Sequence, residues 1–252
     1  SVIQATFTNV NIINNHNTNS NYGNSGGGVL AENSNLTFIN CNINNNNVER
    51  QGSAIYHSCQ QQCTLIFINT NILNNYTTDP QLLAANYDCE SYAEYGYTEE
   101  GPLCYGGAIK IPTNGYSNYP RTTFKMVNSI VRGNYDSFNH GTDSAYTVIH
   151  NFSIGSASDN ENYEPLHLVN SNVENYEVET QWYGYSFNPP NPEPVTWYLE
   201  GNIDADPLFT DPENGDYTLQ EGSPCIDAGT ADLNGYGEED ITDYEGSAPD
   251  MG

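Results

Sequence analysis

The chain has 252 residues, with 32 Asp and Glu against only 5 Lys and Arg, and a net charge of −27 at pH 7. Because this negative field repels other polyanions, we expect no nucleic acid, anionic membrane surface or polyuronate polysaccharide as a partner. No run of 18 apolar residues is present, so no membrane insertion is predicted. The 37 Asn, 20 Tyr and scarce Lys are typical of a secreted or cell-surface protein.

An apolar–polar phrase centred on Asn recurs along the chain. It reads ATFTNVNIINN at 5–15, LTFINCNINNN at 36–46 and LIFINTNILNN at 65–75, with weaker copies further on. Asn and β-branched residues disfavour helix, whereas Asn tolerates the left-handed conformation of a sharp bend. We therefore predict two short strands joined by a one-residue corner in each phrase. The corner residues should stack as an asparagine ladder, and they are Asn9, Asn40, Asn69, Asn128 and Asn170.

A glycine-rich phrase lies between these copies and predicts a third strand. It reads GGGVL at 26–30, GSAIY at 52–56 and GGAIK at 106–110, with a degenerate AYTVI at 145–149. Three strands per turn of about 30 residues predict a right-handed parallel β-helix, which is an all-β solenoid. A β-sandwich is the alternative, but sandwich strands share no corner residue at a fixed period.

This alignment also predicts one outward-facing column on the third strand. The four phrases are aligned on their aliphatic residues, which are Leu30, Ile55, Ile109 and Ile149. The residue directly after each of these then falls in one column, which contains Ala31, Tyr56, Lys110 and His150. We take Tyr56, Lys110 and His150 as candidate ligand-binding residues.

The chain divides into one domain with two parts. Residues 1–200 are predicted to form the coils, with insertions at 76–104 and 176–194, and residues 201–252 to form a terminal coil and an acidic C-terminal cap. Long loops in a compact domain are usually functional or tied down separately.

The six cysteines predict disulfides rather than a metal site. Cys59 and Cys63 lie in HSCQQQC, and Cys89 and Cys104 flank a stretch rich in Tyr and Glu. Neither pair has the spacing of a four-ligand zinc set, so we predict both as disulfides formed in an oxidising compartment. Cys41 and Cys225 are predicted to be buried free thiols, which behave as small apolar side chains.

The segment 201–235, GNIDADPLFTDPENGDYTLQEGSPCIDAGTADLNG, closely resembles the end of secreted bacterial proteins of the choice-of-anchor Q type. The Gly-Gly-Ala-Ile and Phe-x-Asn phrases are similar to the right-handed parallel β-helix repeats of such proteins. The resemblance is absent from the two insertions, and it implies fold and extracellular location rather than an activity. It also implies that the family pattern continues beyond Gly252, and the missing N-terminal cap suggests further chain before Ser1.

The insertions are rich in aromatic residues that suit a sugar ligand. Tyr95 and Tyr97 lie in the first insertion, and Trp182, Tyr183 and Tyr185 in the second. Aromatic rings beside acids and amides, with few cations, fit the faces and hydroxyls of neutral glycans. The alternative is that these rings only pack the loops against the solenoid.

Two acidic clusters near the C-terminus suggest Ca²⁺ as a cofactor. One contains Asp204, Asp206 and Asp211, and the other has Asp232, Asn234 and Asp240 around a glycine turn. Oxygen ligands at alternating positions suit Ca²⁺, although the spacing is not that of an EF-hand. The alternative is that these side chains cap turns.

These features favour an extracellular protein with a structural, adhesive or glycan-binding role. Its partner would be a neutral glycan, a cell-surface or matrix component, or another copy of the chain. A hydrolase acting on neutral polysaccharide is an alternative, which would need two facing carboxylates about 5–10 Å apart. A self-assembling surface or filament subunit is another. No catalytic residue is assigned, because no carboxylate pair or nucleophile motif is fixed by the sequence.

Overall fold

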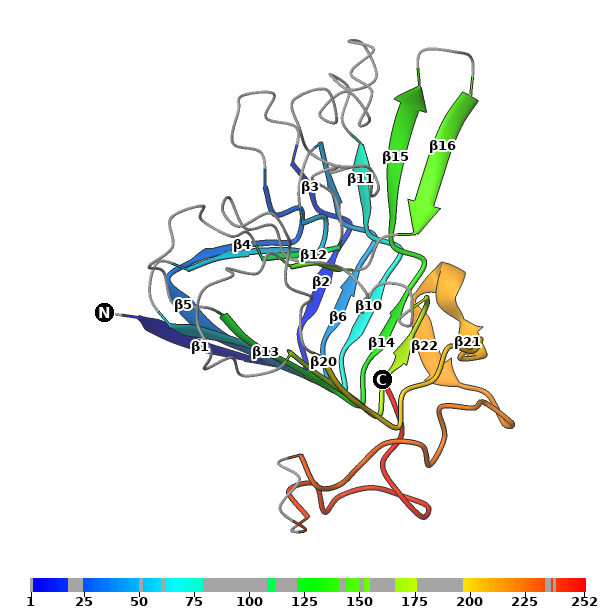
Figure 1. Ribbon diagram of the computed structural model, residues 1–252. Helices are drawn as coiled ribbons and strands as arrows, with labels where there is room; N and C mark the ends of the chain where they lie inside the picture. The colour runs from blue at the N-terminus through cyan, green and yellow to red at the C-terminus, as the bar shows by residue number, and fades with distance from the viewer. Residues whose placement is uncertain are drawn as a thin grey trace.

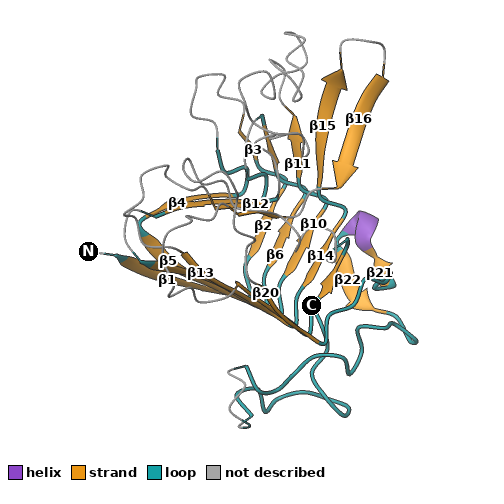
Figure 2. Ribbon diagram, viewed as in Figure 1, coloured by secondary structure: helices purple, strands orange, loops and turns teal. Residues whose placement is uncertain are grey.

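The computed structural model describes residues 2–17, 25–49, 52–59, 62–78, 108–111, 122–140, 144–149, 152–154, 166–175, 197–233, 237 and 239–252. This part of the chain is all-β, with one 3₁₀ turn, and its large sheets consist of parallel strands except for one antiparallel strand at the edge of a sheet (Figures 1 and 2). The prediction of an all-β fold built on parallel strands is therefore confirmed.

The chain passes repeatedly through four sheets in the same order, so that successive passes stack as layers. Sheet 1 contains β1 (Ile3–Thr8), β5 (Ser34–Ile39), β9 (Cys63–Ile68), β13 (Thr122–Val127), β18 (Leu166–Val169) and β20 (Trp197–Glu200). Sheet 2 contains β2 (Asn11–Ile13), β6 (Asn42–Asn44), β10 (Asn71–Leu73), β14 (Ile130–Arg132) and β19 (Asn172–Val173).

The other two sheets complete each layer. Sheet 3 contains β3 (His16–Asn17), β7 (Asn47–Val48), β11 (Tyr76–Thr78) and β15 (Tyr135–His140), to which β16 (Ser144–Ile149) adds in antiparallel orientation. Sheet 4 contains β4 (Val29–Glu32), β8 (Ile55–Ser58), β12 (Ile109–Ile111) and β17 (Phe152–Ile154).

The core lies inside the stack, where inward residues of neighbouring layers meet their equivalents. Burial alternates along β5 and β9, as expected for strands with one face on a core. Phe38 stacks on Phe7 at 4.9 Å and on Phe67 at 5.3 Å between ring centroids. The cluster therefore extends continuously from layer to layer.

Each strand of sheet 1 before β20 ends at one of the five asparagines singled out by the repeat. Asn9, Asn40, Asn69, Asn128 and Asn170 all have left-handed backbones, with φ between 43° and 57°. Their amides do not form the expected ladder. Asn128 and Asn170 instead donate from Nδ2 to the carbonyls of Thr230 and Ala228, at 2.8 and 3.0 Å, and Asn69 Oδ1 has no partner.

A second left-handed corner separates the strand of sheet 2 from the strand of sheet 3. A complete described layer therefore has four strands and not the predicted three. This corner lies between sheets 2 and 3 at Asn14, Asn45, Asn74 and Gly133, with φ between 54° and 64°. The residues that follow carry the amide ladder. Asn15 donates from Nδ2 to Asn46 Oδ1 at 2.9 Å, and the same bond joins Asn46 to Asn75 and Asn75 to Asn134.

Sheet 4 corrects the predicted outward column. Tyr56 is paired with Lys110 as expected, but its partner in β4 is Leu30 and not Ala31. Lys110 is paired with Ser153 of β17, whereas Ile149 ends the antiparallel strand β16. The phrases GGGVL and GSAIY give the observed register when they are aligned from their first glycine, since Val29 then falls on Ile55. Superimposing Leu30 on Ile55 shifted the predicted column by one residue.

The first insertion begins later than predicted, because Tyr76–Thr78, which we assigned to it, form strand β11.

Several other predicted features fall outside the described residues. Residues 79–104 and 176–194 are not described, and with them Tyr95, Tyr97, Trp182, Tyr183, Tyr185 and the cysteine pair Cys89–Cys104. His150 and Asn234 are not described either.

The C-terminal segment, residues 201–252, lies against the outer face of sheet 2 (Figure 1). Its regular elements are β21 (Phe209–Asp211), the turn η2 (Pro212–Asn214) and β22 (Asp216–Leu219). Leu73 and Ile130 of sheet 2 form a second buried cluster with Cys225 and Met251. This packing brings acidic residues of the C-terminal segment next to the strands.

Candidate functional site

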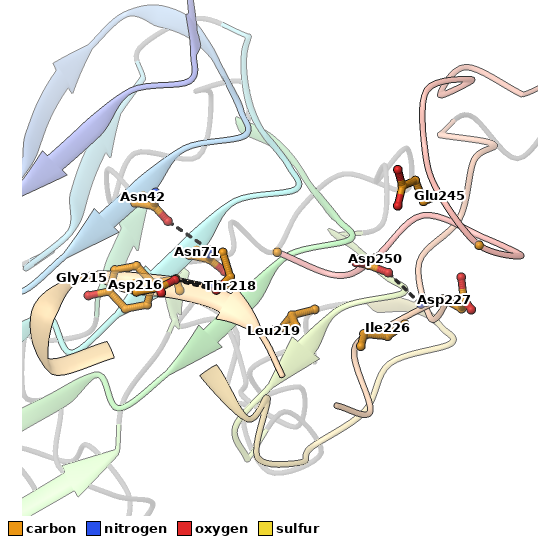
Figure 3. A pocket seen from close by; sticks show the side chains of 13 residues that line it. Asn42, Asn71, Gly215, Asp216, Thr218, Leu219, Ile226, Asp227, Glu245 and Asp250 are labelled. Carbon is orange, nitrogen blue, oxygen red and sulfur yellow. Dashed lines mark hydrogen bonds between the residues drawn. The ribbon is translucent and has the colours of Figure 1, made fainter. Parts of the chain in front are cut away.

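The candidate site is a groove of about 750 Å³ between sheet 2 and the C-terminal segment (Figure 3). It is lined by two asparagines of sheet 2 and by residues from three stretches of the C-terminal segment. These are Asn42, Asn71, Gly215, Asp216, Tyr217, Thr218, Leu219, Ile226, Asp227, Glu245, Gly246, Asp250 and Gly252. None of the described residues that line the groove is basic.

A short outer ladder of asparagines forms the sheet side of the groove. Asn11, Asn42 and Asn71 are in register on β2, β6 and β10. Asn42 Nδ2 donates to Asn11 Oδ1 at 2.9 Å, and Asn71 Nδ2 donates to Asn42 Oδ1 at 3.0 Å. The ladder ends there because Ile130 occupies the next position, and the buried Asn71 Oδ1 has no hydrogen-bond partner.

This outer ladder was missed in the sequence, although its signal is visible. In the first three phrases a second Asn follows the corner Asn by two residues, as in Asn9 and Asn11. The fourth phrase has Ile130 at that position. Because Asn42 alternates with Cys41 and Ile43, which are predicted to point inward, this spacing would have placed the three amides in one outward row.

Carboxylates form the opposite side of the groove and are held by hydrogen bonds. Asp216 Oδ1 accepts from the hydroxyl and the backbone N–H of Thr218, at 2.6 and 3.1 Å, and these bonds lower the pKa of Asp216. Asp227 Oδ1 accepts from Ser247 N at 2.8 Å, and Asp250 Oδ1 accepts from Asp227 N at 2.9 Å. The groove therefore presents fixed acceptors next to the half-buried Tyr217 and Leu219.

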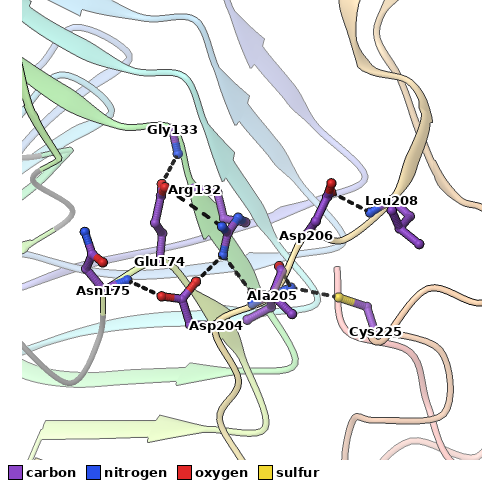
Figure 4. A network of polar contacts seen from close by, with 10 residues as sticks. Arg132, Gly133, Glu174, Asn175, Asp204, Ala205, Asp206, Leu208 and Cys225 are labelled. Atoms are coloured by element: carbon purple, nitrogen blue, oxygen red, sulfur yellow. Dashed lines mark hydrogen bonds and ion pairs between the residues drawn. The ribbon is translucent and has the colours of Figure 1, made fainter.

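The predicted calcium ligands are spread over separate turns. Asp204 accepts from Arg132 at 2.6 Å and from Asn175 N at 2.9 Å, inside a network that also contains Glu174 (Figure 4). Burial raises the pKa of Asp204, but the bonds from Arg132 and Asn175 outweigh it, so the net shift is downward. Asp206 accepts from the backbone of Leu208, and Asp211 from the side chain of Asn214.

Asp232 and Asp240 both lie close enough to Lys125 for their charges to act on it. Lys125, in β13, donates from Nζ to the carbonyl of Leu233, while Leu233 N donates to Asp240 Oδ2 at 2.8 Å. Burial lowers the pKa of Lys125, and the charges of Asp240 and Asp232 oppose this shift. Calcium binding at these residues stays a prediction, and any ion would share the two carboxylates with Lys125.

The described cysteines follow the prediction. Cys59 and Cys63 form a disulfide, and Cys41 and Cys225 are buried free thiols. Burial raises the pKa of Cys225, whose Sγ accepts from Asn172 Nδ2 at 3.1 Å. In the described part of the chain, only His57, Cys59 and Cys63 bring three His, Cys, Asp or Glu ligand atoms within 4.8 Å of one another.

Of the predicted glycan-binding residues, only Tyr56 and Lys110 are described. They are register partners on sheet 4 and thus lie on another sheet than the groove. Burial and the nearby Glu32 raise the pKa of Tyr56.

Comparisons with known proteins add no family. The chain matches no protein-family model, no curated protein and no solved structure. Among the described residues, no helix has both the length and the apolar character needed to cross a membrane.

Proposed function

We propose that the chain forms a right-handed parallel β-helix. The support is that each sheet receives one strand from each successive pass of the chain, with parallel pairing from β1 to β20 in sheet 1. Parallel strands of one sheet require crossover connections, and such connections are right-handed in about 98% of cases. The resemblance of residues 201–235 to secreted β-helix proteins points in the same direction.

We further propose that the protein acts outside the cell or at its surface. The Cys59–Cys63 disulfide supports an oxidising compartment, because cytosolic thiols are usually kept reduced. The net charge of −27 also keeps such a protein soluble and away from anionic lipid and nucleic acid.

We infer that the groove binds a neutral glycan, in keeping with a structural or adhesive role. The supporting observation is its lining, which combines amides, a hydroxyl and carboxylates with apolar side chains and has no basic residue among those described. Hydroxyl groups of a sugar can donate to these acceptors, while its CH faces lie on Tyr217, Leu219 or Ile226. The four carboxylates would repel an anionic polysaccharide.

Binding without hydrolysis fits the groove better than the glycosidase alternative. A glycosidase needs a general acid whose pKa is raised. Asp216 has its pKa lowered by Thr218, and one oxygen of Asp227 and one of Asp250 are engaged with backbone N–H groups. These carboxylates therefore serve as fixed acceptors.

The proposal is tested with an array of uncharged gluco-, manno-, galacto- and xylo-oligosaccharides, with oligogalacturonate as the anionic comparison. We expect binding to at least one neutral series and none to the anionic one. Hits are then measured by calorimetry on Glu245→Gln, which removes a groove charge, against Glu239→Gln, which removes an exposed charge outside the groove lining. Loss of a charged hydrogen bond of about 1.5–3 kcal/mol weakens binding at least about tenfold.

A second pair of variants separates the ladder from the groove. Asn42→Leu changes a groove amide, whereas Asn11→Leu changes the exposed end of the same ladder outside the groove lining. We expect weaker binding only for Asn42→Leu. Equal affinities for both members of each pair, or preference for oligogalacturonate, would show that the groove is not the glycan site.

A further inference from the structure

His57, Cys59 and Cys63 converge where sheet 4 leads back to sheet 1. His57 lies in β8, and Cys63 begins β9 of the next layer. His57 and Cys63 are fully buried, and the three ligand atoms lie within 4.8 Å of one another. The sequence places them as His-x-Cys-x₃-Cys, so a histidine accompanies the cysteine pair that spacing alone assigned to a disulfide.

Hydrogen bonds prepare the imidazole of His57 to bind a metal. Its Nε2 lies 2.7 Å from the carbonyl oxygen of Ser34, which can only accept, so Nε2 carries the proton. The lone pair of the neutral ring is then on Nδ1, whose described neighbour is the hydroxyl of Thr122 at a long 3.4 Å. Metal-binding histidines are commonly oriented in this way by a backbone carbonyl on the opposite nitrogen.

The residues around His57 and Cys63 are polar, and one of them lacks a hydrogen-bond partner. Thr122 is the register partner of Cys63, and Ser34 occupies the equivalent position in β5, since Leu36 pairs with Leu65. Ser34 Oγ is buried without a hydrogen-bond partner.

We propose that His57, Cys59 and Cys63 form a zinc site when the disulfide is reduced. Two thiolates and one imidazole are a zinc ligand set that leaves a fourth position for water, and tetrahedral geometry needs about 3.8 Å between the sulfurs. The disulfide and the zinc ion are alternative states, because both use the same two sulfur atoms.

The two states are related by a balanced exchange. A dithiol or phosphine reductant donates two electrons to the Cys59–Cys63 bond and is itself oxidised, which gives two thiols. Zn²⁺ then binds the two sulfurs and His57 Nδ1, and the two thiol protons are released to water. This site is independent of the proposed glycan groove, with which it shares no residue.

Cobalt substitution of the full chain tests the site. After anaerobic reduction by a phosphine, we expect about one Co²⁺ per chain, with thiolate-to-cobalt charge-transfer and tetrahedral d–d bands that Zn²⁺ abolishes. The oxidised chain should show neither band. His57→Gln should weaken binding about tenfold or more, and Cys59→Ser with Cys63→Ser should abolish it.

Controls exclude the other cysteines and misfolding. Cys41→Ser, Cys225→Ser and the double variant Cys89→Ser, Cys104→Ser should retain the bands. In the unmutated reduced chain, Zn²⁺ should protect Cys59 and Cys63 from alkylation, as read by mass spectrometry, so the test does not depend on the folding of a variant. Unprotected Cys59 and Cys63, or cobalt bands that survive His57→Gln unchanged, would overturn the proposal.

Discussion

The side-chain oxygen of Asn75 accepts two hydrogen bonds from Asn46, one from its backbone N–H at 3.0 Å and one from Nδ2 at 2.9 Å. Asn75 Nδ2 in turn donates to Ile43 O at 2.8 Å and to Asn134 Oδ1 at 3.0 Å. One buried amide thus bonds to groups in the layers on both sides of its own.

Asn75→Ala should therefore be strongly destabilising. It removes the bonds from Asn75 to the backbone N–H of Asn46, to one Nδ2 hydrogen of Asn46 and to the Ile43 carbonyl, although Asn46 Nδ2 still donates to Ile12 O. At about 1–3 kcal/mol for each buried group, we expect a loss of about 3–5 kcal/mol. Asn15→Ala, at the exposed end of this ladder, should cost about 1 kcal/mol. Denaturant unfolding measures both, and equal losses would contradict a cooperative ladder.

The left-handed corner at Asn40 predicts an unusual order of substitutions. Asn40 has φ of 52° and is exposed. Asn40→Ala should lower the free energy of unfolding by about 1–2 kcal/mol, because alanine is strained in this conformation. Asn40→Gly should stay within about 0.5 kcal/mol of the parent, since glycine adopts positive φ freely. If alanine is tolerated better than glycine, the corner is not left-handed in solution.

His57 makes stability depend on pH. Burial lowers its pKa in the folded chain, so between the unfolded value of about 6.5 and the folded value the unfolded chain binds the extra proton. The stabilisation of the folded chain by neutral His57 is complete above the unfolded pKa. It is lost as the pH falls, by up to about 1.4 kcal/mol per pH unit. Unfolding of the oxidised chain in EDTA, from pH 7.5 to 5.5, should show this loss. The same series on His57→Gln should be flatter, and parallel curves would refute the assignment.

Thiol counting should separate the two kinds of cysteine. Without reductant, the denatured chain should expose two thiols, Cys41 and Cys225, if Cys89 and Cys104 are also paired. The native chain should react slowly, because both thiols are buried and burial raises the pKa of Cys225. A count of six would argue against an oxidising compartment.

Calcium should stabilise the acidic part of the chain more than sodium does. Residues 79–252 hold 30 of the 32 acids and 4 of the 5 bases, a net charge of −26. Binding contributes about 2.7 kcal/mol at a hundredfold excess over the dissociation constant. Melting in 1 mM CaCl₂ is compared with NaCl of equal ionic strength. The excess should vanish in Asp232→Asn with Asp240→Asn.

Lys125 supplies a sharper control for the same site. Because its ammonium group lies beside Asp232 and Asp240, Lys125→Met should strengthen calcium binding at these residues. The calcium site at Asp232 and Asp240 is wrong if CaCl₂ raises the melting temperature no more than NaCl does. It is also wrong if the calcium effect is the same in the double Asn variant and in Lys125→Met as in the parent.

The repeat predicted the parallel all-β architecture because inward Phe and Ile positions and corner Asn residues recur together. It did not predict the second corner, because only the central Asn of each phrase was assigned a bend, although Asn14–Asn15 and its copies end the first three phrases in the same way. The ladder therefore belongs to Asn15 and its equivalents rather than to Asn9 and its equivalents.

The groove was beyond prediction for another reason. Asn128 exchanges hydrogen bonds with Thr230, 102 residues away, and no local pattern specifies such a distant contact. Turn-forming acids such as Asp216 look alike in sequence whether they lie beside a strand or in open solvent. The outer ladder of Asn11, Asn42 and Asn71 was readable, but its position beneath the C-terminal segment was not.

Asn46 and Asn75 are separated by 29 residues, and so are Asn42 and Asn71. A tandem duplication of residues 34–62 would therefore place the copied Asn42 and Asn46 on equivalent asparagines in the layers above and below, so both ladders would continue through the added layer. The molecule can grow in steps of one whole layer, each adding about 4.8 Å to its long axis. An insertion of a few residues within a strand would instead shift the register on which the ladders depend.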